Sequence, residues 1–142
     1  MRCEKIMKKD VMCVSPDDSA EQAALIMREQ NVGFLPVCDR DGCVLGALTD
    51  RDLATRMCAD GGDPVETLVG DIMTREVVAC RPEDDITLVE QLMSTNRKMR
   101  IMVTDAAGQL LGVVTLTDVA ERDSNKHTAR TLRKIVGREY RF

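Results

Sequence analysis

The sequence predicts an α/β (α+β) fold of two tandem β-α-β-β-α repeats followed by a C-terminal helix. The chain aligns with itself after a shift of 66 residues, so that residues 6–54 match residues 72–120 without a gap. In each copy an apolar, strand-like run leads directly into Thr-x-x-Asp, which is typical of a helix start. The 142 residues suit one compact domain or two small halves that share a core. Identical pairs at this register include Ile6/Ile72, Met7/Met73, Pro16/Pro82, Met27/Met93, Gly46/Gly112, Thr49/Thr115 and Asp52/Asp118.

The first repeat opens with a short apolar strand at residues 11–14. Ser15-Pro16 ends this strand, because the residue before proline favours extended backbone and proline cannot continue a ladder. Ser19 and the two aspartates before it offer N-cap oxygens to a helix with apolar residues at helical spacing. Residues 31–33, Asn-Val-Gly, end this helix, because glycine after the last periodic residue is the usual helix stop.

The rest of the repeat is expected to be a β-hairpin and a short helix. Residues 34–38 and 44–48 are its strands, joined by the turn-forming residues 39–42. The helix spans residues 49–57. The second repeat predicts the same order, with strands at 77–80, 101–104 and 110–114, a helix near 85–94 and another from Thr117.

These elements predict four segments: a first repeat at residues 1–58, a linker with a short helical turn at 59–70, a second repeat at 71–123, and a C-terminal helix at 124–142. Residues 122–142 carry seven Lys or Arg. The apolar positions Ala129, Leu132, Val136 and Tyr140 of the last segment fall on one helical face, so we expect a basic amphipathic helix.

Composition excludes several classes of protein. The net charge of −4 and the pI near 5.1 argue against a general nucleic-acid coat. No apolar run approaches the roughly 18 residues of a membrane span, and the charged start does not resemble a signal peptide, so we expect a soluble, cytoplasmic protein. Six cysteines without a CxxC and a single histidine argue against a zinc site, and buried thiols are expected.

The tandem pattern resembles the CBS domain pair, or Bateman module, of small stand-alone two-CBS proteins in bacteria and archaea. The residues that carry the resemblance are 14–16, 33–37 and 46–53 with their counterparts in the second repeat. The resemblance covers Ile6 to about Glu121. Met102 departs from it by standing where the first repeat has Pro36.

The resemblance implies two repeats related by a pseudo-two-fold axis, with two equivalent clefts that bind adenosine derivatives in many members. It implies a non-enzymatic regulatory module for signal transduction that senses AMP, ADP, ATP, S-adenosylmethionine or NAD as a regulatory ligand, needs no cofactor and forms a homodimer. The alternative is a ligand-free interaction module that acts through its dimer surface and its C-terminal helix. The chain has no nucleophile motif, Walker loop or paired-histidine metal signature, so we expect no enzyme activity.

The family's ribose-binding carboxylate carries over to Asp52 and Asp118. A carboxylate suits this role because it accepts strong hydrogen bonds from both vicinal hydroxyls of a ribose. The threonine three residues earlier and the free N–H groups of the first helical turn would meet a phosphate. The second repeat has more cations before its middle strand, so the site with Asp118 is favoured. The candidate ligand-binding residues are Val14, Ser15, Pro16, Phe34, Leu35, Pro36, Thr49, Asp50, Arg51, Asp52, Cys80, Arg81, Pro82, Arg97, Lys98, Arg100, Ile101, Thr115, Thr117 and Asp118.

Two other interpretations stay open at this point. Thr and Asp at a helix start are good caps, worth about 1 kcal/mol, without any ligand. Cys13 and Cys38 end two strands that lie close together in this fold, which makes them a candidate redox pair. A cytoplasmic setting disfavours a permanent disulfide there.

Overall fold

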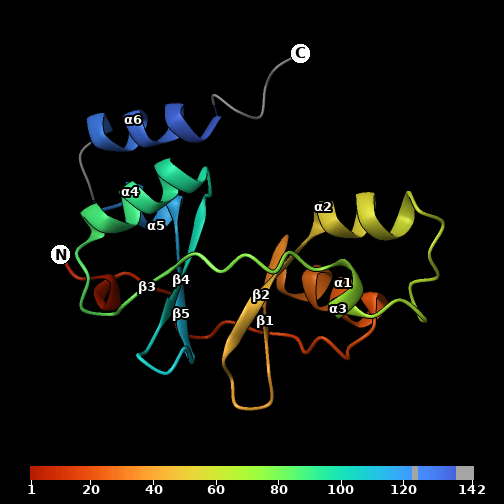
Figure 1. The fold of residues 1–142 in the computed structure, drawn as a ribbon. Helices are drawn as coiled ribbons and strands as arrows, with labels where there is room; N and C mark the ends of the chain where they lie inside the picture. Colours follow the sequence, from red (N-terminus) through yellow and green to blue (C-terminus); the bar gives the residue numbers. More distant parts are fainter. Residues whose placement is uncertain (123–124, 137–142) are drawn as a thin grey trace. The chain divides into compact units, whose positions relative to one another are not determined.

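The computed structural model describes residues 1–122 and 125–136, and it divides into two compact units (Figure 1). Unit 1 combines Met1–Asp10 with the chain from Val78 onward, and unit 2 is Val11–Val77. Each unit therefore contains most of one sequence repeat together with the opening segment of the other. In the described part of the chain no helix is long and apolar enough to cross a membrane.

Unit 2 is a two-stranded hairpin with helices packed against it. Helix α2 continues directly into η2, whose turns are π-helical. Its elements are α1 (Ala20–Gln30), β1 (Phe34–Cys38), β2 (Val44–Thr49), α2 (Asp50–Asp52), η2 (Leu53–Cys58) and α3 (Val69–Ile72).

Unit 1 has a three-stranded sheet in the order β3-β4-β5, and α6 lies beside α4 (Figure 1). Its elements are η1 (Cys3–Lys5), β3 (Ala79–Cys80), α4 (Ile86–Asn96), β4 (Arg100–Thr104), β5 (Leu110–Thr115), α5 (Leu116–Ala120) and α6 (Asn125–Val136).

The two hairpins have the same register, which confirms the predicted duplication. Phe34 pairs with Thr49 in unit 2, and Arg100 pairs with Thr115 in unit 1. Both ladders also shift register at the same place, after Val37 and after Val103. Residues 66 apart in the sequence therefore occupy equivalent places.

The first strand of each repeat is shorter than predicted. Residues 11–14 form only one parallel bridge, between Val14 and Val37, and the second repeat forms only the two-residue β3. Proline explains the difference between the units. Met102 donates its N–H to the Val78 carbonyl at 3.3 Å, whereas Pro36, at the equivalent position, has no N–H to donate.

The first helix ends where residues 31–33 predict, but the left-handed residue at its end is Asn31 and not the glycine. Asn31 is the C-cap of α1 with a φ of 53°, and Arg97 is the C-cap of α4 with a φ of 54°. Asparagine is one of the few side chains that tolerates this conformation, whereas arginine is not. Arg97 is therefore held in an unfavourable backbone conformation by its surroundings.

The opening segments are exchanged between the repeats. Lys8 forms an antiparallel bridge with Val113 of β5, and its equivalent Thr74 bridges Ala47 of β2. A glycine precedes each bridge because the segment crosses close to the strand. A Cβ on Gly112 would lie 2.6 Å from the Lys8 carbonyl oxygen, and a Cβ on Gly46 would lie closer still to the Thr74 oxygen.

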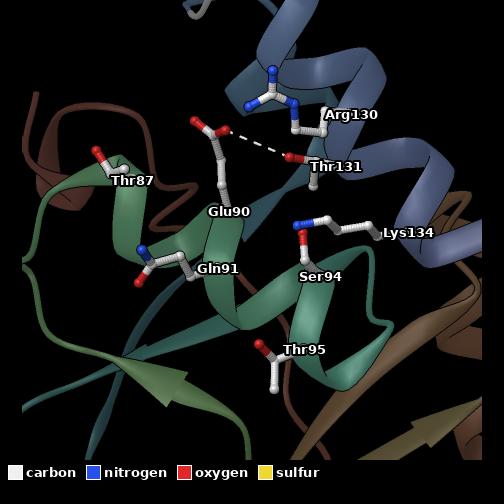
Figure 2. Close-up of a pocket in the computed structure, with 8 residues that line it drawn as sticks. All are labelled: Thr87, Glu90, Gln91, Ser94, Thr95, Arg130, Thr131 and Lys134. Carbon is white, nitrogen blue, oxygen red and sulfur yellow. Dashed lines mark hydrogen bonds between the residues drawn. The ribbon is translucent and has the colours of Figure 1, made fainter.

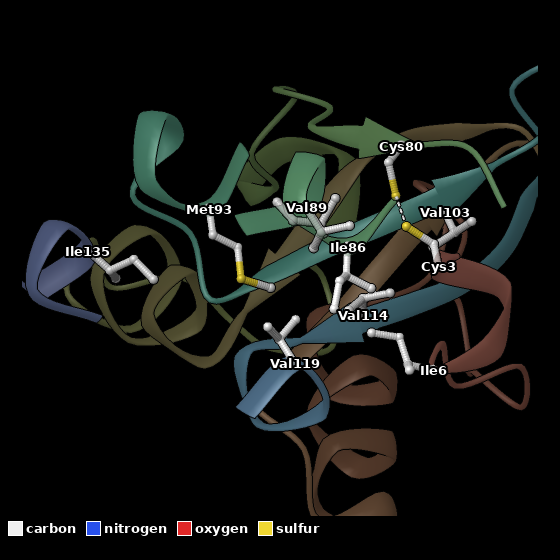
Figure 3. Packing of buried hydrophobic residues seen from close by; sticks show 11 residues of the cluster. Cys3, Ile6, Cys80, Ile86, Val89, Met93, Val103, Val114, Val119 and Ile135 are labelled. Atoms are coloured by element: carbon white, nitrogen blue, oxygen red, sulfur yellow. Dashed lines mark hydrogen bonds between the residues drawn. The ribbon is translucent and has the colours of Figure 1, made fainter. Parts of the chain in front are cut away.

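Each unit has its own apolar core, built mainly of aliphatic side chains. Leu35, Val37 and Leu48 are central in unit 2. In unit 1, Val89, Met93 and Ile101 belong to the same buried cluster as Cys3 and Cys80. Figure 3 shows this cluster, with the sulfurs of the two cysteines facing each other. The expectation of buried thiols holds for Cys3, Cys38 and Cys80, whereas Cys13 and Cys58 are exposed.

The buried face of α6 differs from the predicted one. Thr131 and Ile135 are buried, whereas Leu132 is 38% exposed and Ala129 is also exposed; Tyr140 lies outside the described residues. Counting apolar residues favours the stripe through Leu132, but the neighbouring stripe carries the branched Ile135, which joins the unit 1 core. Thr131 can face α4 because its hydroxyl donates to Glu90 Oε2 at 3.5 Å.

Candidate ligand site at the strand-to-helix corners

The corner between β5 and α5 in unit 1 holds Asp118 in a fixed position. The Thr115 N–H donates to Asp118 Oδ2 at 2.8 Å, and the Asp118 N–H donates to Thr115 Oγ1 at 3.2 Å. This reciprocal pair is a capping box, so the predicted capping role of the Thr-x-x-Asp motif is confirmed. The cap uses one carboxylate oxygen and leaves Oδ1 for another partner.

The partner of Asp118 Oδ1 is Lys8, from the exchanged opening segment. The Lys8 Nζ lies 3.9 Å from Oδ1, and the lysine side chain is 65% exposed while that of Asp118 is 12% exposed. An exposed pair at this distance contributes little to stability. A ligand hydroxyl could therefore take the place of Lys8 at small cost.

The equivalent corner of unit 2 is more occupied. Asp52 forms the same capping box with Thr49, at 3.0 and 3.2 Å. Its Oδ1 lies 3.7 Å from Arg56 Nε and accepts a hydrogen bond from the Thr74 hydroxyl at 3.5 Å. Arg56 is itself held by a hydrogen bond to the Met73 carbonyl at 3.1 Å. A ligand at Asp52 would compete with two donors rather than one.

The basic segment around the start of β4 also approaches the unit 1 corner. Arg100 pairs with Thr115 across β4 and β5. The Leu116 N–H donates to the Met99 carbonyl at 2.8 Å, which brings the segment before β4 to the start of α5. Arg97, Lys98 and Arg100 thus lie on the segment that approaches the corner, and Arg97 and Arg100 are exposed.

In unit 2 the structure brings Phe34, Thr49, Asp50 and Asp52 to one corner. The Asp50 N–H donates to the Gly33 carbonyl at 3.0 Å, and a Cβ on Gly33 would lie 2.6 Å from Asp50 Oδ2, so a larger residue there would displace the Asp50 side chain. Leu35, Pro36 and Ile101 are buried in the strands, whereas Arg51 and Thr117 are exposed on the helices.

The proline segments lie at the other end of the middle strands. Val14 pairs with Val37, three residues along β1 from the Phe34–Thr49 corner, which is about 10 Å of strand. Ser15 and Pro16 lead farther away from Asp52.

In unit 1, Cys80, Arg81 and Pro82 are likewise at the far end of β4. The Arg81 guanidinium donates to the Asp105 carbonyl and to Thr104 Oγ1 at 3.3 Å. Among the described contacts, none joins these residues to the Asp118 corner.

The candidate redox pair Cys13 and Cys38 lies within unit 2. Burial is the main reason that the pKa of Cys38 is raised to about 12, and the Cys13 thiol is the next contribution. Both cysteines carry free thiols in this structure, Cys13 exposed and Cys38 buried.

A surface hollow lies elsewhere in unit 1, between α4 and α6 (Figure 2). Its volume is about 240 Å³, and it is lined by Thr87, Glu90, Gln91, Ser94, Thr95, Arg130, Thr131 and Lys134. None of these residues belongs to the strand-to-helix corners. The hollow is therefore separate from the candidate ligand site at the corners.

Sequence reasoning missed Lys8 and Thr74 as neighbours of the two aspartates. A signal was present, since both residues directly follow the identical Ile-Met pairs of the repeats. The 66-residue shift shows that they are equivalent, but it does not reveal that each one joins the hairpin of the other repeat.

Comparisons with known proteins agree with this architecture. A family model described as the CBS domain matches residues 3–58 and 69–125. The CBS domain-containing protein YhcV of Bacillus subtilis is 35% identical over 123 residues, which are 87% of this chain and 86% of that protein. The chain also matches inosine-5'-monophosphate dehydrogenase of Methanocaldococcus jannaschii at 30% identity over 129 residues, but it spans only 25% of that enzyme.

Solved structures agree as well. The conserved CBS domain protein TA0289 of unknown function from Thermoplasma acidophilum has a TM-score of 0.84 at 28% identity, covering 99% of this chain and 79% of that one. The CBS domain pair of protein MJ0100, in complex with 5'-methylthioadenosine and S-adenosyl-L-methionine, has a TM-score of 0.76 at 25% identity, covering 85% of this chain and 94% of that one. The chain therefore belongs to the CBS domain family and carries two CBS domains in tandem.

Proposed function

We propose that this CBS domain pair is a regulatory module that binds an adenosine-containing ligand at the unit 1 corner. The observation that carries the proposal is the state of Asp118, whose Oδ2 is fixed by the cap while Oδ1 has an exposed lysine partner. A rigid carboxylate with one readily freed oxygen suits the two vicinal hydroxyls of a ribose. The complex of MJ0100 with two adenosine derivatives supports this class of ligand.

Phosphate or another anionic group of the ligand would be met by the cations of the same unit. Arg97 and Lys98 precede β4, Arg100 is its first residue, and Lys8 is beside the ribose position. The unfavourable φ of Arg97 supports a functional role for that side chain, because such strain is retained where the residue is needed. Titration would identify which adenosine derivative binds, whether AMP, ADP, ATP, S-adenosylmethionine or NAD.

The unit 2 corner is proposed as the weaker site. Its aspartate has the same cap, but Arg56 and Thr74 already hold the second oxygen. A ligand there must displace both donors, so we expect lower affinity or no occupancy.

The capping boxes already engage Asp118 and Asp52 and the groups around them can hold a polar, anionic ligand, so we propose a binding role for these corners. Homodimer formation, a regulated partner protein and a cytoplasmic location stay predictions from the sequence. So does a redox role for Cys13 and Cys38.

Calorimetric titration with AMP, ADP, ATP, S-adenosylmethionine and NAD tests the proposal, on protein freed of carried-over ligand. The informative variant is Asp118→Asn, because the amide oxygen can still accept the Thr115 N–H while the charge and the second acceptor are lost. Asp52→Asn is the matched control in unit 2. We expect Asp118→Asn to weaken the best ligand at least tenfold and Asp52→Asn to change it less than threefold.

Two results would contradict the proposal. Silence across the panel, in protein whose thermal melting shows that it is folded, would leave the Thr-x-x-Asp motifs as helix caps and put the interaction-module alternative first. Binding that Asp52→Asn abolishes and Asp118→Asn leaves intact would move the site to unit 2.

A further inference from the structure

Two buried cysteines of unit 1 lie against each other although 76 residues separate them in the sequence. The Cys80 thiol donates to Cys3 Sγ across 3.5 Å, and the two residues are 4% and 0% exposed (Figure 3). Figure 3 shows the sulfurs pointing toward each other, Cys3 from the opening segment and Cys80 from β3. Both are free thiols in this structure.

The other unit shows that the core does not need sulfur at these places. Under the 66-residue shift Cys3 is equivalent to Val69 and Cys80 to Val14. Both valines are buried in the unit 2 core. An aliphatic pair therefore fills these two positions in unit 2, and only unit 1 has cysteines at both of them.

The backbone around the two sulfurs is already held together. The Cys3 N–H donates to the Asp84 carbonyl at 2.8 Å, and the Glu4 N–H donates to the Pro82 carbonyl at 3.0 Å. These bonds fasten the opening segment to the loop that follows Cys80. The sulfurs need only approach from 3.5 Å to the bonding distance of about 2.05 Å.

We propose that Cys3 and Cys80 form a reversible disulfide that fastens the opening segment to unit 1. The oxidant is a low-molecular-weight disulfide of the glutathione class. The Cys3 thiolate attacks one sulfur of the oxidant and releases one thiol, and the Cys80 thiolate then attacks Cys3 Sγ in the mixed disulfide and releases the second thiol. The protein loses two electrons and two protons, and the oxidant gains both as it becomes two thiols.

Cys3 is suited to react first. The hydrogen bond from Cys80 lowers the pKa of Cys3, against the effect of burial. The same hydrogen bond and burial both raise the pKa of Cys80. Cys3 is also the easier of the two thiols to reach, because η1 is only three residues long and Arg2, Glu4 and Lys5 around Cys3 are exposed.

This inference goes beyond the proposed function and does not depend on it. The segment that the disulfide would fasten also carries Lys8, which pairs with Asp118. Oxidation would thus restrain the segment that brings Lys8 to the candidate ligand corner, whatever the ligand is.

The test is equilibrium oxidation of the full chain in buffers of increasing ratio of oxidised to reduced glutathione. Equilibrium is approached both from native protein and by dilution from urea, because buried thiols in the native protein could react too slowly to form a disulfide that is stable at equilibrium. Acid quenching, alkylation and mass spectrometry of peptides then identify each linkage. The matched variants are Cys3→Val and Cys80→Val, which reproduce the residues of unit 2, and Cys13→Ala, which reproduces Ala79 of the second repeat.

We expect the Cys3–Cys80 peptide to exceed half of the protein at the oxidising end from both starting points, also in Cys13→Ala. The melting temperature of the oxidised protein should rise by about 5–15 °C over the reduced protein, with no rise in either valine variant. The proposal is overturned if both thiols stay free from both starting points. Glutathione adducts, or bonds to other cysteines in place of Cys3–Cys80, would overturn it as well.

Discussion

Replacing Gly112 by alanine tests how the opening segment is attached to unit 1. A Cβ at this position would lie 2.6 Å from the Lys8 carbonyl oxygen and 3.0 Å from Met7 Sδ. The sulfur belongs to a flexible side chain and can move away. The carbonyl belongs to the backbone, and it must retreat by about 0.8 Å, from 2.6 Å to the 3.4 Å at which ordinary contact begins.

That retreat breaks the bridge between the segment and β5. The Val113 N–H donates to the Lys8 carbonyl at 3.0 Å, and the Lys8 N–H donates to the Val113 carbonyl at 2.9 Å. Each hydrogen bond is worth about 1 kcal/mol, and leaving a buried group unpaired costs about 1–3 kcal/mol more. Val113 is 5% exposed, so Gly112→Ala should lower the free energy of unfolding by about 2–4 kcal/mol.

Urea unfolding measures this change, and hydrogen exchange at the Lys8 and Val113 amides locates it. The control is Gly108→Ala, because no atom lies within 4 Å of the added Cβ and only the φ of +86° is strained, which costs about 1 kcal/mol. If Gly112→Ala loses no more stability than Gly108→Ala and keeps its amide protection, the segment does not cross β5 as described.

Three further outcomes are expected. Arg97→Asn places at the end of α4 the residue that ends α1, and asparagine tolerates the positive φ better than arginine, so the free energy of unfolding should rise by about 0.5–1 kcal/mol. Calorimetry should also show weaker binding of a phosphate-bearing ligand. A lower free energy of unfolding would contradict the strain argument. Ile135→Ala should cost about 2–4 kcal/mol in urea unfolding and Leu132→Ala less than about 1 kcal/mol, and the reverse order would restore the face predicted from sequence. Hydrogen bonds from Thr87 hold the pKa of Asp85 below its ordinary value of 3.8. The stabilising contribution of Asp85 is therefore present above pH 3.8 and is lost as the pH falls through the lowered pKa. Asp85→Asn should make the free energy of unfolding, measured in urea, fall less steeply with decreasing pH, and an unchanged pH dependence would refute the assignment.

The hairpins could be predicted from the sequence because their signals are local. Turn residues 39–42 between two apolar runs define one hairpin, and the 66-residue shift predicts the second with the same register. The capping boxes follow in the same way, since Thr49 and Asp52 are three residues apart and need no distant partner.

Features that depend on contacts between residues far apart in the sequence could not be predicted from it. Lys8 meets Asp118 only because the opening segment joins the other repeat's hairpin. Cys3 meets Cys80 for the same reason, although their equivalence to two buried valines was visible once the repeats were aligned. The helix end at Arg97 contradicts local preference, and local preference was the only guide available at that position.

The exchange of opening segments also determines the order in which the parts of the chain can fold during synthesis. Residues 11–77 are contiguous, so unit 2 can fold as soon as they leave the ribosome. The segment with Cys3 and Lys8 is made earlier, yet its partner Val113 follows Lys8 by 105 residues, which is about 5–20 s of synthesis. Until Cys80 is made, 77 residues after Cys3, the thiol of Cys3 lacks the partner that it has in the folded protein. The segment made before unit 2 therefore completes its contacts only after unit 2 has been made.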